Sequence, residues 1–224
     1  MRLPRPAAYV IFDMDGVLLD TERFYTEVTQ EIVARFGKTY DWSVKSQLIG
    51  RPEIESARRL VEALELPITP EEYLAERKLG LARLMPGTQA MPGARELVER
   101  LHAHGVPVAV ATSSTSRLYA LKTERHADWF RLFSAVVRGD DSRLARGKPA
   151  PDIFLLAASD LGADPARCVV IEDSPVGVEA AHAAGMQAVA VPHAEMGRTP
   201  FAAAELVVDS LAELAAEDLV GGSR

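Results

Sequence analysis

Short apolar runs alternate with helical patterns along most of this chain. Residues 8–12 form an unbroken apolar run rich in β-branched and aromatic side chains, which predicts a strand buried on both faces, as in a parallel sheet. Five similar runs follow, with helical patterns between them. These predicted strands are Val106–Ala111, Ala135–Arg138, Cys168–Ile171, Gln187–Val191 and Leu206–Val208. The alternation predicts an α/β fold with an open, mostly parallel sheet and helices on both faces.

Residues 17–88 interrupt this alternation, because four amphipathic patterns of helical period follow one another with no predicted strand. The first helix is expected to begin after Thr21 and end near Gly37, and the second to begin after Asp41 and end near Gly50. The third is expected from near Ile54 to near Leu64, and the fourth from after Thr69 to near Met85. Connections in α/β units usually span about 2–6 residues. Residues 17–88 are therefore expected to form a four-helix cap subdomain inserted into a core of residues 1–16 and 89–224, placed to close over the preceding strand end.

Two aspartates follow the first predicted strand. Side chains alternate along a strand, so Asp13 and Asp15 are expected on the same side, and Gly16 permits a tight turn after them. Two acids at one strand tip predict either a raised pKa or a bound cation. Capping of the next helix is the alternative interpretation.

Three further polar clusters stand near later strand ends. They are the hydroxyl-rich turn Thr112–Ser116, Lys148 between a glycine and a proline, and the acidic pair Glu172-Asp173. Each alone is typical of a helix cap or a solvated side chain. The carboxyl ends of parallel strands share one edge of a sheet, so we expect all four clusters to lie together.

Such a cluster suits phosphoryl transfer. Oxygen ligands from Asp13 and Asp173, with Glu172 nearby and the carbonyl of Asp15, favour Mg2+. We expect Asp13 to attack phosphorus as a nucleophile and Asp15 to exchange protons with the leaving alcohol and with water.

The positive and hydroxyl groups would bind the phosphoryl oxygens. Lys148 neutralises them, and Thr112 donates a hydrogen bond, with Ser113 in the same anion-binding turn.

Composition narrows the possible partners. The chain has 224 residues with a formal net charge of -7, which argues against a broad nucleic-acid surface. No apolar segment approaches the ~20 residues of a membrane span. The single cysteine, Cys168, excludes an intramolecular disulfide and is expected in the core. We expect a cytoplasmic, monomeric protein without membrane or nucleic-acid partners.

Four segments resemble, in order, the motifs of the haloacid dehalogenase superfamily, in the group with a helical cap after the first motif. They are FDMDGVLLDTE (12–22), ATSS (111–114), GKPAPDIF (147–154) and VIEDSPVGVEAA (170–181). The resemblance implies a Rossmann-like core and a phosphatase. It assigns the nucleophile to Asp13, the acid/base to Asp15, phosphate contacts to Thr112 and Lys148, and Mg2+ contacts to Asp13, Asp15 and Asp173 with Glu172 supporting.

Segments outside the motifs resemble one group of phosphatases within this superfamily. They are residues 42–46, 122–126, 130–134 and 139–141. This resemblance implies a nucleoside 5'-phosphate substrate, pseudouridine 5'-phosphate in particular. A sugar phosphate is the second candidate. The candidate substrate contacts in the cap are Glu22, Tyr25 and Arg51. Another group, Lys122, Arg125 and His126, either lines the entrance or, as the favoured interpretation, forms an exposed helix face.

Three other functions are weighed against hydrolysis of a phosphate ester. Sugar-phosphate mutases of the β-phosphoglucomutase type carry histidine at the position of Tyr25 and arginine at that of Glu53. Receiver-type switches lack the inserted cap and the acid at Asp15. Dehalogenases have no use for a metal ion at Glu172-Asp173.

Overall fold

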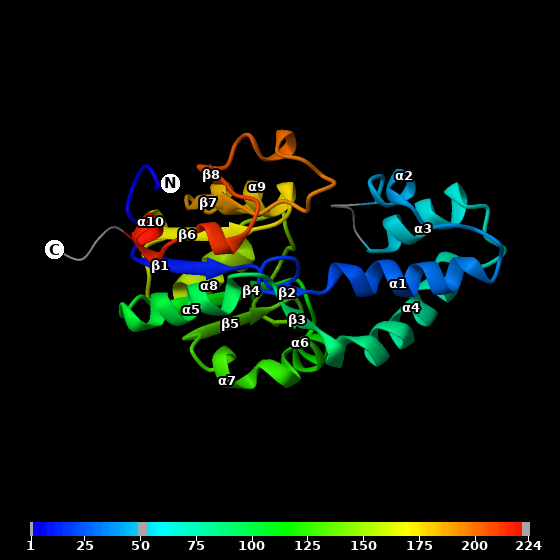
Figure 1. Ribbon diagram of the computed structural model, residues 1–224, viewed down its shortest axis with the longest axis horizontal. Coiled ribbons are helices and arrows are strands. Elements are labelled where there is room, and N and C mark those ends of the chain that lie inside the picture. The colour runs from blue at the N-terminus through cyan, green and yellow to red at the C-terminus, as the bar shows by residue number, and fades with distance from the viewer. Residues whose placement is uncertain (1, 49–52, 221–224) are drawn as a thin grey trace. The chain divides into compact units, whose positions relative to one another are not determined.

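A computed structural model describes residues 2–48 and 53–220 of the chain (Figure 1). The chain divides into two compact units, a sheet unit of residues 1–20 and 88–224 and a helical unit of residues 21–87. The helical unit begins at Thr21, later than the expected boundary, because the chain first forms strand β2 (Leu19–Asp20). This strand pairs antiparallel with β3 (Gln89–Ala90). The prediction of no strand between Val17 and Thr88 is therefore wrong, since a two-residue strand is too short to show a period.

The sheet unit is built on a six-stranded sheet in the order β5-β4-β1-β6-β7-β8. Every pairing in it is parallel, as the sequence predicted. The strands are β1 (Tyr9–Phe12), β4 (Val108–Thr112), β5 (Ala135–Arg138), β6 (Cys168–Glu172), β7 (Gln187–Ala190) and β8 (Leu206–Val207). β4 begins after Pro107 and includes Thr112, so the hydroxyl turn starts one residue later than predicted.

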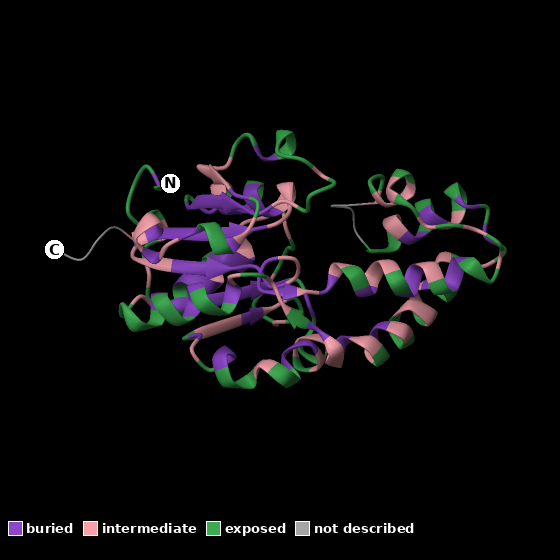
Figure 2. Ribbon diagram, in the orientation of Figure 1, coloured by how far each residue is buried: buried purple, intermediate pink, exposed green. Residues whose placement is uncertain are grey.

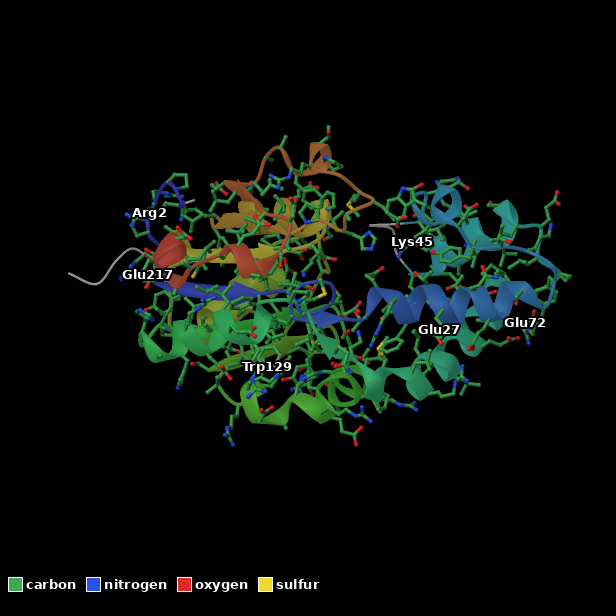
Figure 3. The ribbon with its side chains drawn as sticks, viewed as in Figure 1. Arg2, Glu27, Lys45, Glu72, Trp129 and Glu217 are labelled. Carbon is green, nitrogen blue, oxygen red and sulfur yellow. The ribbon has the colours of Figure 1, made fainter. Side chains whose placement is uncertain are left out.

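Helices cover both faces of this sheet because its central strands are apolar on both sides. In β1, Val10 and Phe12 belong to one hydrophobic cluster and Ile11 to the other, all with no exposure. Strands β1, β4, β6 and β7 are accordingly drawn mostly as buried in Figure 2, whereas β5 and β8 at the sheet edges are mostly intermediate. The first cluster includes residues of α5 (Ala94–Ala103), α7 (Ala127–Phe130) and α10 (Ala216–Val220), and the second those of α8 (Asp152–Asp160) and α9 (Pro175–Ala183). Trp129 of α7, labelled in Figure 3, fills the first cluster.

Shorter elements complete the sheet unit. Helix α6 (Ser116–Thr123) follows β4, and single 3-10 turns cover residues 124–126, 165–167, 199–201 and 211–213. Cys168 is buried in β6, as expected, and burial raises the pKa of its thiol to about 11. Within the part of the chain that the structure describes, no helix is long and apolar enough to cross a membrane.

The helical unit consists of α1 (Glu22–Ala34), α2 (Trp42–Lys45), α3 (Glu53–Ala63) and α4 (Pro70–Leu84), followed by a 3-10 turn at 85–87. Helix α4 packs on both α1 and α3. Gly80 makes the α1 contact close, because a Cβ there would lie 2.6 Å from the side chain of Val28. The buried hydroxyls of Thr29 and Tyr73 hydrogen-bond across the same pair of helices at 2.8 Å.

Helix starts in this unit follow the predicted caps in two of three cases. The Thr69 side chain and Glu72 form the predicted capping box of α4, and the Asp41 carboxylate accepts from the backbone N–H of Val44 in α2. Thr21 stands at the N-cap of α1 but makes no capping bond, because its backbone is already αR there. Helix α2 ends at Lys45, and the predicted end at Gly50 lies outside the described residues.

Candidate active site

Asp13 follows β1 directly and is held from one side by Lys148. The Lys148 ammonium lies 2.5 Å from Asp13 Oδ1 and 2.6 Å from Glu172 Oε1, so a single lysine joins the acids of two strand ends. All three side chains are largely buried, with exposed fractions of 9% for Asp13, 7% for Lys148 and 1% for Glu172. The sequence predicted that these residues share one edge of the sheet, and the adjacency of the parallel strands β1 and β6 brings the two acids to the same lysine.

Glu172 is fixed by the start of helix α9. Its Oε2 accepts from both the backbone N–H of Ser174 at 2.8 Å and the Ser174 hydroxyl at 2.9 Å. Gly177 leaves the space for it, since a Cβ there would lie 1.9 Å from Glu172 Oε1. The Ser174 hydroxyl in turn accepts from the N–H of Gly177, which is the predicted N-cap of α9. Glu172 therefore directs one oxygen to Lys148 and the other to the helix.

The positive charge of Lys148 does not by itself offset the negative charges of the acids at this edge of the sheet. Burial raises the pKa of Asp13 to about 7, and the neighbouring charges of Glu172 and Asp15 add to the effect while Lys148 opposes it. For Lys148, burial would lower the pKa, but the charges of Asp13 and Glu172 outweigh it and raise the pKa above its ordinary value. Lys148 is therefore protonated at neutral pH, whereas Asp13 needs further positive charge to be fully ionised there.

Asp15 lies in the turn that follows β1, and Asp173 lies directly after β6. A Cβ on Gly16 would lie 2.2 Å from Asp173 Oδ2, so there is no room for a side chain at this position. Gly16 also has a φ of 76°, a backbone conformation that favours glycine. The turn after β1 thus passes directly against the acid that follows β6. The Asp15 carboxylate is bound by Ser114, which donates to Oδ2 at 2.9 Å, and by Lys122, which lies 2.5 Å from Oδ1.

The hydroxyl-rich turn after β4 contacts Asp15 through the side chain of Ser114. Thr112 is fully buried, and its Oγ1 accepts from the N–H of Ser114 at 3.0 Å, which leaves its own hydroxyl hydrogen as a donor. Ser113 is exposed, and its carbonyl passes so close to Gly139 that a Cβ there would lie 2.2 Å away. Thr112 and Ser113 thus occupy the strand end that the sequence predicted for them.

Sequence reasoning missed the position of Lys122, which lies against Asp15. The favoured interpretation placed it with Arg125 and His126 on an exposed helix face, but the Lys122 side chain has no exposure. Arg125 is exposed as expected, whereas His126 is partly buried and its Nε2 lies 3.0 Å from the carbonyl of Thr88. Helix α6 is too short for its periodicity to separate the buried face from the solvated one.

The substrate contacts predicted in the cap belong to the helical unit. Glu22 forms an ion pair with Lys45 at 3.2 Å, and Lys45, labelled in Figure 3, also donates to the Thr26 hydroxyl. The Arg77 guanidinium lies 5.8 Å from the centre of the Tyr25 ring. Arg51 lies outside the described residues.

The predicted Mg2+ site was compared with the donors present. Within residues 2–48 and 53–220, no three His, Cys, Asp or Glu side chains form a group that could hold a metal ion by themselves. Mg2+ usually binds one or two carboxylates and keeps several waters, so such a group is not required. Asp13 and Asp173 supply oxygen donors at adjacent strand ends. Burial first, and then the charges of Glu172 and Asp15, raise the pKa of Asp13, and a cation would offset this effect. The residues present therefore fit Mg2+.

This strand edge is also the switch point of the sheet, because the chain continues from β1 to β4 on one side and returns to β6 on the other. Open α/β sheets bind their ligands at such points, so fold and site together define an α/β enzyme with a polar site at the carboxyl ends of β1, β4 and β6.

Comparison with known proteins identifies the family. The family model described as haloacid dehalogenase-like hydrolase matches residues 8–185, and the chain belongs to this family. It is 45% identical over 215 residues to (DL)-glycerol-3-phosphatase 2 of Arabidopsis thaliana, covering 94% of this chain and 90% of that protein. It is 44% identical over 216 residues to a probable pseudouridine-5'-phosphatase of Drosophila melanogaster, covering 95% and 94%.

A solved structure agrees with this assignment. A haloacid dehalogenase family hydrolase from Deinococcus radiodurans, solved with bound phosphate and sodium, superposes with a TM-score of 0.78 at 31% identity and covers 94% of each chain. The family and the phosphatase relatives confirm the predicted enzyme class, so this chain is a phosphoric monoester hydrolase.

Proposed function

We propose that this chain hydrolyses the phosphate ester of a small metabolite through an aspartyl-phosphate on Asp13, with Mg2+ as cofactor. The observation that carries the proposal is the buried Asp13 carboxylate, joined through Lys148 to Glu172 at the switch point of the sheet. A desolvated carboxylate is a reactive nucleophile once it is ionised.

Asp13 and Asp15 divide the chemistry between them. As Asp13 Oδ bonds to phosphorus, the bond to the alcohol oxygen breaks and that oxygen takes a proton from Asp15. In the second step Asp15 takes a proton from water, the water oxygen bonds to phosphorus and the bond to Asp13 breaks. The alcohol and inorganic phosphate leave, and both aspartates return to their starting states.

The surrounding donors would bind the transferring phosphoryl group. Lys148 supplies a fixed positive charge, and Thr112 and Ser113 supply hydroxyl and backbone donors from the end of β4. Glu172 holds Lys148 in place, and its contacts with Ser174 suit the supporting role.

Asp13, Asp173 and the carbonyl of Asp15 would hold Mg2+, with Glu172 behind them. When bound, the ion neutralises phosphoryl oxygens and lowers the pKa of Asp13.

Two substrates are proposed on the strength of the relatives. Pseudouridine 5'-phosphate, as the leading nucleoside 5'-phosphate, is supported by the Drosophila relative, and glycerol 3-phosphate by the Arabidopsis relative at similar identity.

The cytoplasmic location and the monomeric state stay predictions.

Mutase activity is the main alternative. In mutases of the β-phosphoglucomutase type an arginine at the position of Glu53 would bind a second phosphate. Here Glu53 is an acid and forms an ion pair with Arg77, which also lies over the rings of Tyr25 and Tyr73. The arrangement favours hydrolysis. Isomerisation of glucose 1-phosphate that depended on a catalytic bisphosphate would contradict it.

A panel of phosphate esters tests the function. Phosphate release is measured from pseudouridine 5'-phosphate, glycerol 3-phosphate, fructose 1-phosphate and uridine 5'-phosphate, with Mg2+ or with EDTA. We expect release from one or both proposed substrates with Mg2+, and none with EDTA or from Asp13→Asn. Release by Asp13→Asn at the wild-type rate would overturn the proposed chemistry, whereas preference for another ester would overturn only the substrate.

A further inference from the structure

Lys122 is a charged side chain with no exposed surface, on helix α6 of the sheet unit. A buried ammonium is strongly unfavourable unless an opposite charge and hydrogen-bond acceptors surround it. Its Nζ lies 2.5 Å from Asp15 Oδ1 and donates to the Ser114 hydroxyl at 2.7 Å. The partner of this buried charge is therefore the carboxylate to which the proposed function gives the proton transfers.

Ser114 closes a three-residue ring with the other two. Its hydroxyl accepts from Lys122 and donates to Asp15 Oδ2 at 2.9 Å, so its donor and its acceptor are both used consistently. Each oxygen of the Asp15 carboxylate is thereby bound by a different neighbour. Two contacts on two oxygens fix both the direction of the carboxylate and its rotation about the Cβ–Cγ bond.

The elements that carry Ser114 and Lys122 are themselves anchored. Ser114 follows β4 in the sheet, and α6 starts with the Thr115 hydroxyl accepting from the N–H of Leu118. The Asp140 carboxylate accepts from both the N–H and the hydroxyl of Ser116 at 2.8 to 3.0 Å. The position of Lys122 is thus set by the packed core rather than by a loose surface segment.

Exposure differs sharply across the ring. The Asp15 side chain is 24% exposed, whereas Lys122 has no exposure. A substrate can therefore contact Asp15 directly but cannot contact Lys122. Any effect of Lys122 on the reaction therefore acts through Asp15.

We propose that Lys122 is a positioning residue which, together with Ser114, fixes the Asp15 carboxyl group, which gives a proton to the leaving alcohol in the first step and takes one from water in the second. The proposal rests on the proposed function. A carboxylate has about four lone-pair positions, and contacts on both of its oxygens restrict its orientation. Proton transfer requires the acid within hydrogen-bond reach of the leaving oxygen, and small losses of orientation are costly.

Leaving groups of different basicity test this role. An alkyl phosphate needs protonation of its leaving oxygen, whereas 4-nitrophenyl phosphate releases a stable anion and needs it much less. For Lys122→Met we expect kcat/KM for glycerol 3-phosphate to fall by about 10- to 100-fold, and for 4-nitrophenyl phosphate by less than about 5-fold. kcat/KM is the relevant constant because it reports the steps up to departure of the leaving group. Equal losses on both esters would overturn the proposal.

A double-mutant cycle shows whether Lys122 acts through Asp15. In the Asp15→Asn background, Lys122→Met is expected to change kcat/KM for glycerol 3-phosphate by less than about 2-fold, because the group it positions is already gone. An effect that simply multiplies that of Asp15→Asn would contradict the proposal.

A matched control separates positioning from general damage to α6. Thr123→Val changes the next residue, whose hydroxyl donates only to the Tyr119 carbonyl among the hydrogen bonds observed, and should leave the ratio between the two esters unchanged. If Lys122→Met does not fold, as judged by circular dichroism, Ser114→Ala removes the other contact and should give the same ester dependence. An unchanged ratio in Ser114→Ala would then overturn the proposal. A wild-type chain inactive on 4-nitrophenyl phosphate and on every ester of the substrate panel contradicts the proposed function instead.

Discussion

At the residue scale, the main feature of the site is that several acids share few positively charged partners. Asp13, Glu172 and Asp15 lie close enough for their charges to affect one another, and Lys148 contacts two of them. The sequence predicted these acids because they stand at strand ends, and Lys148 because it lies in the loop that follows another strand, β5. It did not predict that Lys122 pairs with Asp15, because the burial of one lysine on a short helix depends on what packs against that helix.

The raised pKa of Asp13 predicts a pH dependence of stability. Asp13 titrates at about 7 in the folded chain against 3.8 for an ordinary aspartate, so the folded chain holds this proton more tightly. The stability contributed by protonated Asp13 is present below about pH 4 and is lost as the pH rises through 7. In EDTA, Asp13→Asn should therefore gain unfolding free energy relative to wild type between pH 4 and 8, measured by urea denaturation. A difference that does not vary with pH would contradict the raised pKa.

At the element scale, the junction between β6 and α9 positions the site. The predicted strand, the Ser174 cap and the helix were all confirmed, because each depends on local sequence signals. The closeness of Gly177 to Glu172 was not predicted, since it depends on the angle at which the helix leaves the strand. The two-residue pair β2–β3 was missed for a related reason, because its partners are far apart in the sequence.

Gly177→Ala tests this junction. The added Cβ would lie 1.9 Å from Glu172 Oε1, and Glu172 cannot move aside easily because it is buried and bound to Lys148 and Ser174. We expect the unfolding free energy to fall by about 1–3 kcal/mol, as in other overpacked sites, and kcat to fall with it as Lys148 shifts. Glu179→Ala, an exposed change in the same helix, is the control. Unchanged stability and kcat in Gly177→Ala would show that the site tolerates a displaced Glu172.

At the scale of the whole molecule, the six-stranded parallel sheet brings side chains separated by about 160 positions to one edge. The order β4-β1-β6 puts Thr112, Asp13 and Glu172 on three neighbouring strands. The helical unit of residues 21–87 is inserted between β2 and β3, and its four helices were predicted from their periodicity.

Mg2+ binding links the site to the stability of the whole sheet unit. A ligand that binds only the folded chain stabilises it by RT ln(1 + [L]/Kd), about 2.7 kcal/mol at 100 times Kd. Saturating Mg2+ should raise the unfolding midpoint of the EDTA-treated chain, measured calorimetrically. Asp173→Asn should weaken this rise without the same loss in Mg2+-free stability, while Ca2+ serves to compare a larger ion. No Mg2+-dependent rise in wild type would contradict the proposed metal site.

The sequence by itself determined the alternation of elements, the parallel sheet, the inserted helices and the candidate residues at strand ends. Each of these follows from local periodicity, cap chemistry and the shared edge of parallel strands. Only the tertiary structure decided which charges meet: Lys148 between Asp13 and Glu172, and Lys122 behind Asp15. Burial and pairing of a charge depend on groups brought together from distant parts of the chain, and no local pattern encodes that meeting.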